Sequence, residues 1–178
     1  LIKQGKVAAF TVAGGQGTRL GYDGPKGTLS VSSIAQKSLF QIFAEQIYAW
    51  TQKSDRSIAW YIMCSPLNIE ATESFFVDHS YFGLASEDVY FFTQGVLPAF
   101  DTAGKVLLKD QDHLALSPNG HGGSFKALID AQAIQNMQER DVEHISYFQV
   151  DNPLVHIFDP LFIGLHHLEK SDMSSRSL

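Results

Sequence analysis

The sequence has little cysteine, an excess of negative charge and no long apolar run. Its one cysteine, Cys64, excludes an internal disulfide and a metal site built from several cysteines. Thirteen Lys and Arg against nineteen Asp and Glu give a net charge of -6, which argues against the basic face that a nucleic-acid partner requires. We recognise no signal peptide and no stretch that could span a bilayer, so we expect a cytoplasmic protein without a membrane partner.

Both ends of the sequence are typical of a piece of a longer protein. The chain begins at Leu1 without methionine, reaches a strand-like run by Val7, and ends over 174–178 without a periodic pattern. We predict a single domain over 1–178 that is truncated at both ends. The alternative is that both ends are frayed.

Short apolar runs alternate with stretches of helical periodicity. Helices are predicted over 38–53 with Ser38 as N-cap, over 68–76, over 122–140, and from Pro160 with Asp159 as N-cap. Strands are predicted over 6–13, 57–64, 88–93 and 145–150. This alternation predicts an α/β fold with a mostly parallel sheet flanked by helices. A further short strand over 105–109 would add a small antiparallel ribbon.

Three polar features follow the ends of predicted strands. A glycine-rich loop follows the first strand, Gln94 follows the third, and Asp151 follows the last. Because ligands of parallel α/β sheets bind outside the carboxyl ends of the strands, we expect the three features to converge at one edge.

The glycine-rich loop, VAGGQGTRLGYDGPKG, runs from Val12 to Gly27 and has Arg19 and Lys26 as its only cations. Glycines let a ligand approach the backbone, and successive N–H groups form a nest for an anion. A guanidinium and an ammonium both suit phosphate. The pattern therefore favours phosphate binding over a glycine-rich turn that holds no ligand.

Two better-known phosphate loops do not fit this stretch. The dinucleotide fingerprint would require glycine where Leu20 stands, and the P-loop would require Ser or Thr where Gly27 follows Lys26. The misfit at Leu20 also argues against a dinucleotide-dependent oxidoreductase. The loop must hold phosphate in a third way.

Four motifs, taken in order, resemble those of UTP-dependent nucleotide-sugar pyrophosphorylases, which are nucleotidyltransferases. Residues 13–21 with 25–27 are similar to the signature loop of that family, and KSLFQI at 37–42 is similar to its UTP-dependent branch. Three later stretches resemble the uracil-side segment, the second glycine loop and the metal-binding strand end of that branch, at 91–99, 117–123 and 150–155. The resemblance covers nearly the whole chain.

The resemblance implies a Rossmann-like, GT-A-like nucleotidyltransferase domain that transfers UMP from UTP to a sugar 1-phosphate and releases pyrophosphate, with Mg²⁺ as cofactor. A sugar phosphate is already an anionic nucleophile, so the reaction needs positioning and electrostatic stabilisation rather than a nucleophilic triad. A nucleotide-sugar-binding domain without catalysis is an alternative.

The resemblance also implies roles for individual residues. Arg19 and Lys26 would be catalytic, and Asp151 would bind the metal. Gln94 would read the uracil edge, which the donor and acceptor of one carboxamide can match. The other substrate-binding candidates lie in the first glycine loop, in the second glycine loop and beside the metal ligand: Ala13, Gly14, Gly15, Gly17, Thr18, Gly120, His121 and Asn152.

The motif around His121 does not decide which sugar 1-phosphate is the substrate. The acetylglucosamine enzymes resemble Gly-Asn-Gly-Gly at this place and the glucose enzymes resemble Gly-His-Gly-Asp, whereas this chain has GHGG at 120–123. The flanking stretches favour N-acetylglucosamine 1-phosphate, with glucose 1-phosphate as the alternative. The remaining histidines lack metal-ligand spacing and are predicted to be surface or packing residues: His79, His113, His144, His156, His166 and His167.

Overall fold

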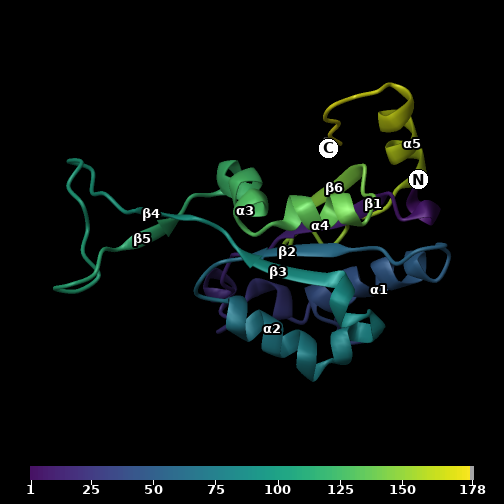
Figure 1. Ribbon diagram of the computed structural model, residues 1–178. Coiled ribbons are helices and arrows are strands. Elements are labelled where there is room, and N and C mark those ends of the chain that lie inside the picture. Colours follow the sequence, from purple (N-terminus) through teal and green to yellow (C-terminus); the bar gives the residue numbers. More distant parts are fainter. Residues whose placement is uncertain (177–178) are drawn as a thin grey trace.

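A four-stranded parallel sheet lies at the centre of the computed structural model, which describes residues 1–176 (Figure 1). Its strand order is β3-β2-β1-β6, and every neighbouring pair is parallel. The strands are β1 Val7–Val12, β2 Trp60–Cys64, β3 Val89–Thr93 and β6 His144–Gln149. The predicted α/β class is confirmed, and residues 177–178 of the predicted domain lie outside the described residues.

Helices cover both faces of the sheet (Figure 1). On one face lie α1 Leu39–Thr51 and α2 Ile69–Asp78, and on the other α3 Ser124–Asp130 and α4 Ala133–Glu139. Side chains alternate between the two cores, as a strand requires: Trp60 and Ile62 belong to the first core, Tyr61 and Met63 to the second. Because both faces are buried, β2 is a continuous apolar run.

The predicted helix starts are confirmed where a side chain caps them. Ser38 Oγ accepts a hydrogen bond from the amide of Gln41 and caps α1. Asp159 Oδ1 accepts hydrogen bonds from two amides of α5 Pro160–Leu168, with proline in the first turn. Within residues 1–176, six short 3₁₀ turns complete the helical structure: Ile2–Gln4, Thr18–Leu20, Lys26–Thr28, Ser80–Gly83, Ser86–Asp88 and His121–Gly123.

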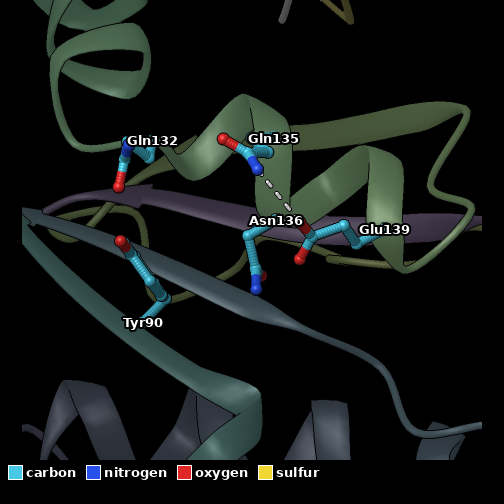
Figure 2. Close-up of a pocket in the computed structure, with 5 residues that line it drawn as sticks. All are labelled: Tyr90, Gln132, Gln135, Asn136 and Glu139. Carbon is cyan, nitrogen blue, oxygen red and sulfur yellow. Dashed lines mark hydrogen bonds between the residues drawn. The ribbon is translucent and has the colours of Figure 1, made fainter.

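The prediction of one helix over 122–140 is wrong, because the chain breaks between α3 and α4. Gln132 has a left-handed backbone with φ 56°, and the Tyr90 hydroxyl donates a 2.6 Å hydrogen bond to the carbonyl of Ala131 at the break. Figure 2 shows Tyr90 on its strand across from Gln132. Phe125 and Ile129 of α3 are exposed. A tertiary contact thus overrides a helical sequence pattern.

An antiparallel ribbon is confirmed, but its strands differ from the predicted one. Strands β4 Val96–Pro98 and β5 Leu116–Pro118 pair with each other and project from the sheet (Figure 1). The predicted strand 105–109 contributes only isolated bridges, from Val106 to Phe100 and from Leu108 to Leu114.

The first core contains a buried hydrogen bond and the one cysteine. Trp60 Nε1 donates to Thr11 Oγ1 over 2.7 Å, and neither side chain is exposed. Cys64 is fully buried, and burial raises the pKa of its thiol to about 12. None of the helices in residues 1–176 combines the length and apolar character needed to cross a membrane.

Candidate active site

The carboxyl edge of the sheet brings the three predicted features together. Strand β1 lies between β2 and β6: the chain goes from β1 to β2 and β3 on one side, and later to β6 on the other side. Such a reversal is a topological switch point, where parallel α/β sheets bind their ligands. The loop after β1 contacts the residues after β3 and after β6 through Gly14 and Lys26. The predicted convergence of the glycine loop, Gln94 and Asp151 is confirmed.

Gln94 lies directly against the glycine loop. Its backbone amide donates to the carbonyl of Cys64 over 2.8 Å, and the residue is only 7% exposed, unlike a solvated loop residue. A Cβ on Gly14 would lie 2.5 Å from Gln94 Nε2. Glycine at position 14 is therefore what lets the carboxamide occupy this place.

Three consecutive amides of the loop are available to an anion. Within residues 1–176, no hydrogen-bond acceptor meets the N–H groups of Gly14, Gly15 and Gln16. Thr18 is exposed and begins a 3₁₀ turn, and its amide likewise has no acceptor in that part of the chain. Unpaired N–H groups in succession are the nest that phosphate requires.

Two predicted members of the amide set are engaged elsewhere. The Ala13 amide donates to Met63 in the sheet over 2.8 Å, and the Gly17 amide donates to the Gly24 carbonyl over 2.9 Å. A Cβ on Gly17 would lie 2.7 Å from the Tyr22 ring, so this glycine shapes the loop. Neither amide is therefore free for an anion in this structure, and substrate binding by Ala13 and Gly17 stays a prediction.

Asn68 anchors the loop, a role that the sequence analysis missed. It is 1% exposed, its Nδ2 donates to the Ala13 carbonyl over 3.0 Å, and its Oδ1 accepts from the Ser65 amide over 2.8 Å. Asn68 was predicted only as the start of a helix. An asparagine there is an ordinary capping signal, and nothing in the sequence reveals that it reaches the first loop.

The two cations of the loop lie in different surroundings. The Lys26 ammonium is 3.0 Å from Asp151 Oδ2, and a Cβ on Gly15 would lie 3.8 Å from the same nitrogen. Lys26 therefore bridges the amide nest and the end of β6. Arg19 is exposed on the 3₁₀ turn, and no carboxylate among the described residues pairs with it.

Asp151 pairs with Lys26 through one of its two carboxylate oxygens. Its side chain is half exposed, and within residues 1–176 only one carboxylate oxygen has a partner. A carboxylate with a free oxygen beside a phosphate site suits Mg²⁺, which uses few protein ligands. Asn152 is exposed in the turn after β6, where its amide donates to the Gln149 carbonyl over 3.2 Å.

The second glycine loop places His121 beside a tyrosine that the sequence analysis did not single out. Gly120 has φ 69°, which favours glycine, and precedes the 3₁₀ turn that carries His121. His121 Nδ1 lies 2.7 Å from the Tyr147 hydroxyl oxygen. Tyr147 stands on β6 with its ring edge against Phe10, and burial raises its pKa.

Asn119 fills the space between this loop and the segment after β3. A Cβ on Gly123 would lie 2.1 Å from its Nδ2, and one on Gly95 would lie 2.7 Å from the same atom. Asn119 Oδ1 is buried, and it has no hydrogen-bond partner among the described residues. The two glycines thus let Asn119 tie the second glycine loop to the Gln94 segment.

The chain is similar to proteins named for one activity. It is 40% identical over 186 aligned positions to the "Probable UDP-N-acetylglucosamine pyrophosphorylase" of Schizosaccharomyces pombe, covering 99% of this chain and 39% of that protein. It is 44% identical to the UDP-N-acetylglucosamine pyrophosphorylase of Saccharomyces cerevisiae, covering 92% and 35%. The chain thus spans well under half the length of these relatives.

A solved structure and a family model agree with these relatives. The uridine diphosphate N-acetylglucosamine pyrophosphorylase of Trypanosoma brucei, in complex with an inhibitor, superposes with a TM-score of 0.86 at 31% identity, covering 95% of this chain and 36% of that one. Residues 3–175 match the family described as UTP–glucose-1-phosphate uridylyltransferase, UDPGP. Since that match takes in all four motifs, the chain belongs to the UDPGP family of uridylyltransferases.

Proposed function

We propose that this chain forms the nucleotide-binding part of an enzyme that transfers UMP from UTP to a sugar 1-phosphate and releases pyrophosphate. One observation carries the proposal: Lys26, paired with Asp151, lies beside the unpaired amides of Gly14 to Gln16 at the switch point of the sheet. This arrangement suits a chain of phosphates, because amides and an ammonium face it together.

The reaction needs charge neutralisation more than proton transfer. The sugar-phosphate oxygen forms a bond to the α-phosphorus of UTP, and the bond between the α-phosphorus and its bridging oxygen to the β-phosphate breaks, so that pyrophosphate leaves with the electron pair. Lys26, the loop amides and Arg19 would stabilise the charge on the phosphoryl oxygens. Mg²⁺, held by Asp151, would add positive charge at the phosphates.

Recognition of the base falls to Gln94. Its carboxamide lies against Gly14, and one donor and one acceptor can pair with uracil. Gly120 would allow the backbone to approach the same base. From the composition we also expect a cytoplasmic location and no nucleic-acid partner.

N-acetylglucosamine 1-phosphate is the sugar substrate that we favour, because the relatives with 40% and 44% identity are named UDP-N-acetylglucosamine pyrophosphorylases. Glucose 1-phosphate is the second candidate, since His121 is the residue type expected in the glucose enzymes. In this chain the Tyr147 hydroxyl engages His121 Nδ1, which leaves Nε2 to meet a substrate.

The test is an assay of the full-length protein with UTP, Mg²⁺ and a panel of sugar 1-phosphates, scored by pyrophosphate release. We expect fastest release with N-acetylglucosamine 1-phosphate, and loss of at least about 100-fold in Lys26→Met and Asp151→Ala. Lys109→Met, an exposed lysine in the ribbon, is the matched control and should leave the rate unchanged. Near-normal rates in the first two variants would contradict the proposal.

A further inference from the structure

A cluster of metal-ligating side chains lies at the edge of the sheet opposite the candidate active site. Glu143 and His144 stand at the amino end of β6, and His167 stands in the last turn of α5. His144 Nε2 lies 3.1 Å from His167 Nδ1, and one ligand atom from each of the three residues lies within 4.8 Å of the others.

The fold fixes these side chains in place. The amides of Glu143 and His144 both donate to the carbonyl of Lys6, over 2.9 and 3.0 Å, which fixes the start of β6 against β1. His166, the neighbour of His167, is engaged through its Nδ1 with Ser174 Oγ at 2.8 Å. Both rings pack against the His144 ring, with centroid distances of 5.1 Å for His166 and 5.3 Å for His167, and it is His167 Nδ1 that meets His144 Nε2.

The separation of the two imidazole nitrogens is close to that of two ligands on one ion. Two nitrogens bound to Zn²⁺ at about 2.0–2.1 Å in a tetrahedral arrangement lie roughly 3.3–3.4 Å apart. The observed 3.1 Å is a hydrogen bond between the two imidazoles, so an ion would replace the proton that they share and move the nitrogens slightly apart. Two histidines and a carboxylate are a ligand set that zinc sites use, with water as the fourth ligand.

Some neighbouring charges oppose the binding of a cation in this cluster, and others favour it. The Lys6 ammonium is 2.5 Å from one oxygen of Glu143, so it competes with a cation for that carboxylate. Within residues 1–176, the second carboxylate oxygen has no hydrogen-bond partner. The C-terminal end of α5 favours positive charge beside His167.

We propose that Glu143, His144 and His167 bind one divalent transition-metal ion, with Zn²⁺ the best fit, and that this ion clamps α5 to the start of β6. Imidazole nitrogen with carboxylate oxygen selects zinc over magnesium, which prefers oxygen ligands only. The site lies away from the nucleotide loop and does not depend on the proposed transferase activity. His144 and His167 are 23 residues apart, so they form no ligand motif in the sequence, and only the fold brings them together.

The experiment is calorimetric titration of the full-length protein with ZnCl₂ after treatment with EDTA, repeated with MgCl₂. We expect a zinc-binding event of one ion per chain that weakens at least about tenfold in both His144→Gln and His167→Gln, whereas any magnesium binding, such as that proposed at Asp151, should be unchanged in both variants. His156→Gln, an exposed histidine outside the cluster, is the matched control and should bind zinc as the wild type does.

Two further variants test the carboxylate. Glu143→Gln should weaken zinc binding, whereas Lys6→Met should strengthen it, because removal of the ammonium frees the carboxylate. Circular dichroism checks that each variant is folded, so a lost binding event is not lost structure. Zinc affinity that is the same in wild type, His144→Gln and His167→Gln would overturn the proposal, and so would the absence of a stoichiometric event in the wild type.

Discussion

Substituting Gly14 by alanine separates recognition of the base from recognition of the phosphates. The added Cβ would lie 2.5 Å from Gln94 Nε2, 3.1 Å from Cδ and 3.3 Å from Oε1. To reach an ordinary contact of 3.4 Å, Nε2 must move by roughly 0.9 Å, which takes the carboxamide out of its present place. The obstacle is the far end of a flexible side chain, so the fold can absorb the change.

The expected magnitudes follow from these contacts. Gly14 does not have a positive φ, so alanine fits its backbone and gains about 0.4–1 kcal/mol through the unfolded state, which offsets the cost of moving Gln94. We expect the free energy of unfolding to change by less than about 1 kcal/mol. Loss of two hydrogen bonds to uracil, about 0.5–1.5 kcal/mol each, would raise the Kd for UTP by about 5- to 150-fold.

The assay is calorimetric binding of UTP and of inorganic tripolyphosphate to the full-length protein. Gly14→Ala should weaken UTP binding and leave tripolyphosphate binding nearly unchanged, while Lys26→Met should weaken both. Gly164→Ala on α5, where nothing lies within 4 Å of the added Cβ, is the control and should change neither. Unchanged UTP binding in Gly14→Ala, or an equal loss for both ligands, would refute the assignment of Gln94 to the base.

Three further predictions concern the core beneath the site. Gly27→Ala should lower the free energy of unfolding by at least about 2 kcal/mol in chemical denaturation, because the new Cβ would lie 2.2 Å from the ring of Phe40, which is fully buried; wild-type stability would contradict this contact. Thr11→Val should cost about 1–3 kcal/mol in the same measurement, since it leaves the buried Trp60 Nε1 without an acceptor; an equal loss in a Trp60→Phe background would disprove the coupling. Cys64 has a folded pKa of about 12 against an ordinary 9.0, so it favours folding below pH 9 and this contribution is lost as pH rises towards 12. The stability difference between wild type and Cys64→Ala should therefore shrink above pH 9. A difference that grows with pH would contradict a raised pKa of Cys64 in the folded state.

Local patterns predicted the elements that position the site. The buried runs that became β1 and β2 were found within three residues, and the Ser38 cap was found because its chemistry is local. The convergence of Gln94 and Asp151 on the glycine loop followed from a topological rule about parallel sheets rather than from either residue alone.

Tertiary contacts decided what the sequence could not reveal. The break at Gln132 depends on Tyr90, which lies 41 residues from the carbonyl to which its hydroxyl donates. The engagement of the Gly17 amide depends on how the loop folds back on Gly24, and the approach of His167 to His144 depends on where α5 rests. Helical periodicity and motif spacing carry no information about such pairings.

The amides of the glycine loop test the central claim most directly. With selective ¹⁵N-glycine labelling of the full-length protein, the resonances of Gly14 and Gly15 should shift on titration with UTP, because their N–H groups would meet phosphate. Gly17, whose amide already donates to Gly24, should shift less, and Gly164 on α5 should not shift. If the resonances of Gly14 and Gly15 do not shift at saturating UTP, the loop does not hold the triphosphate.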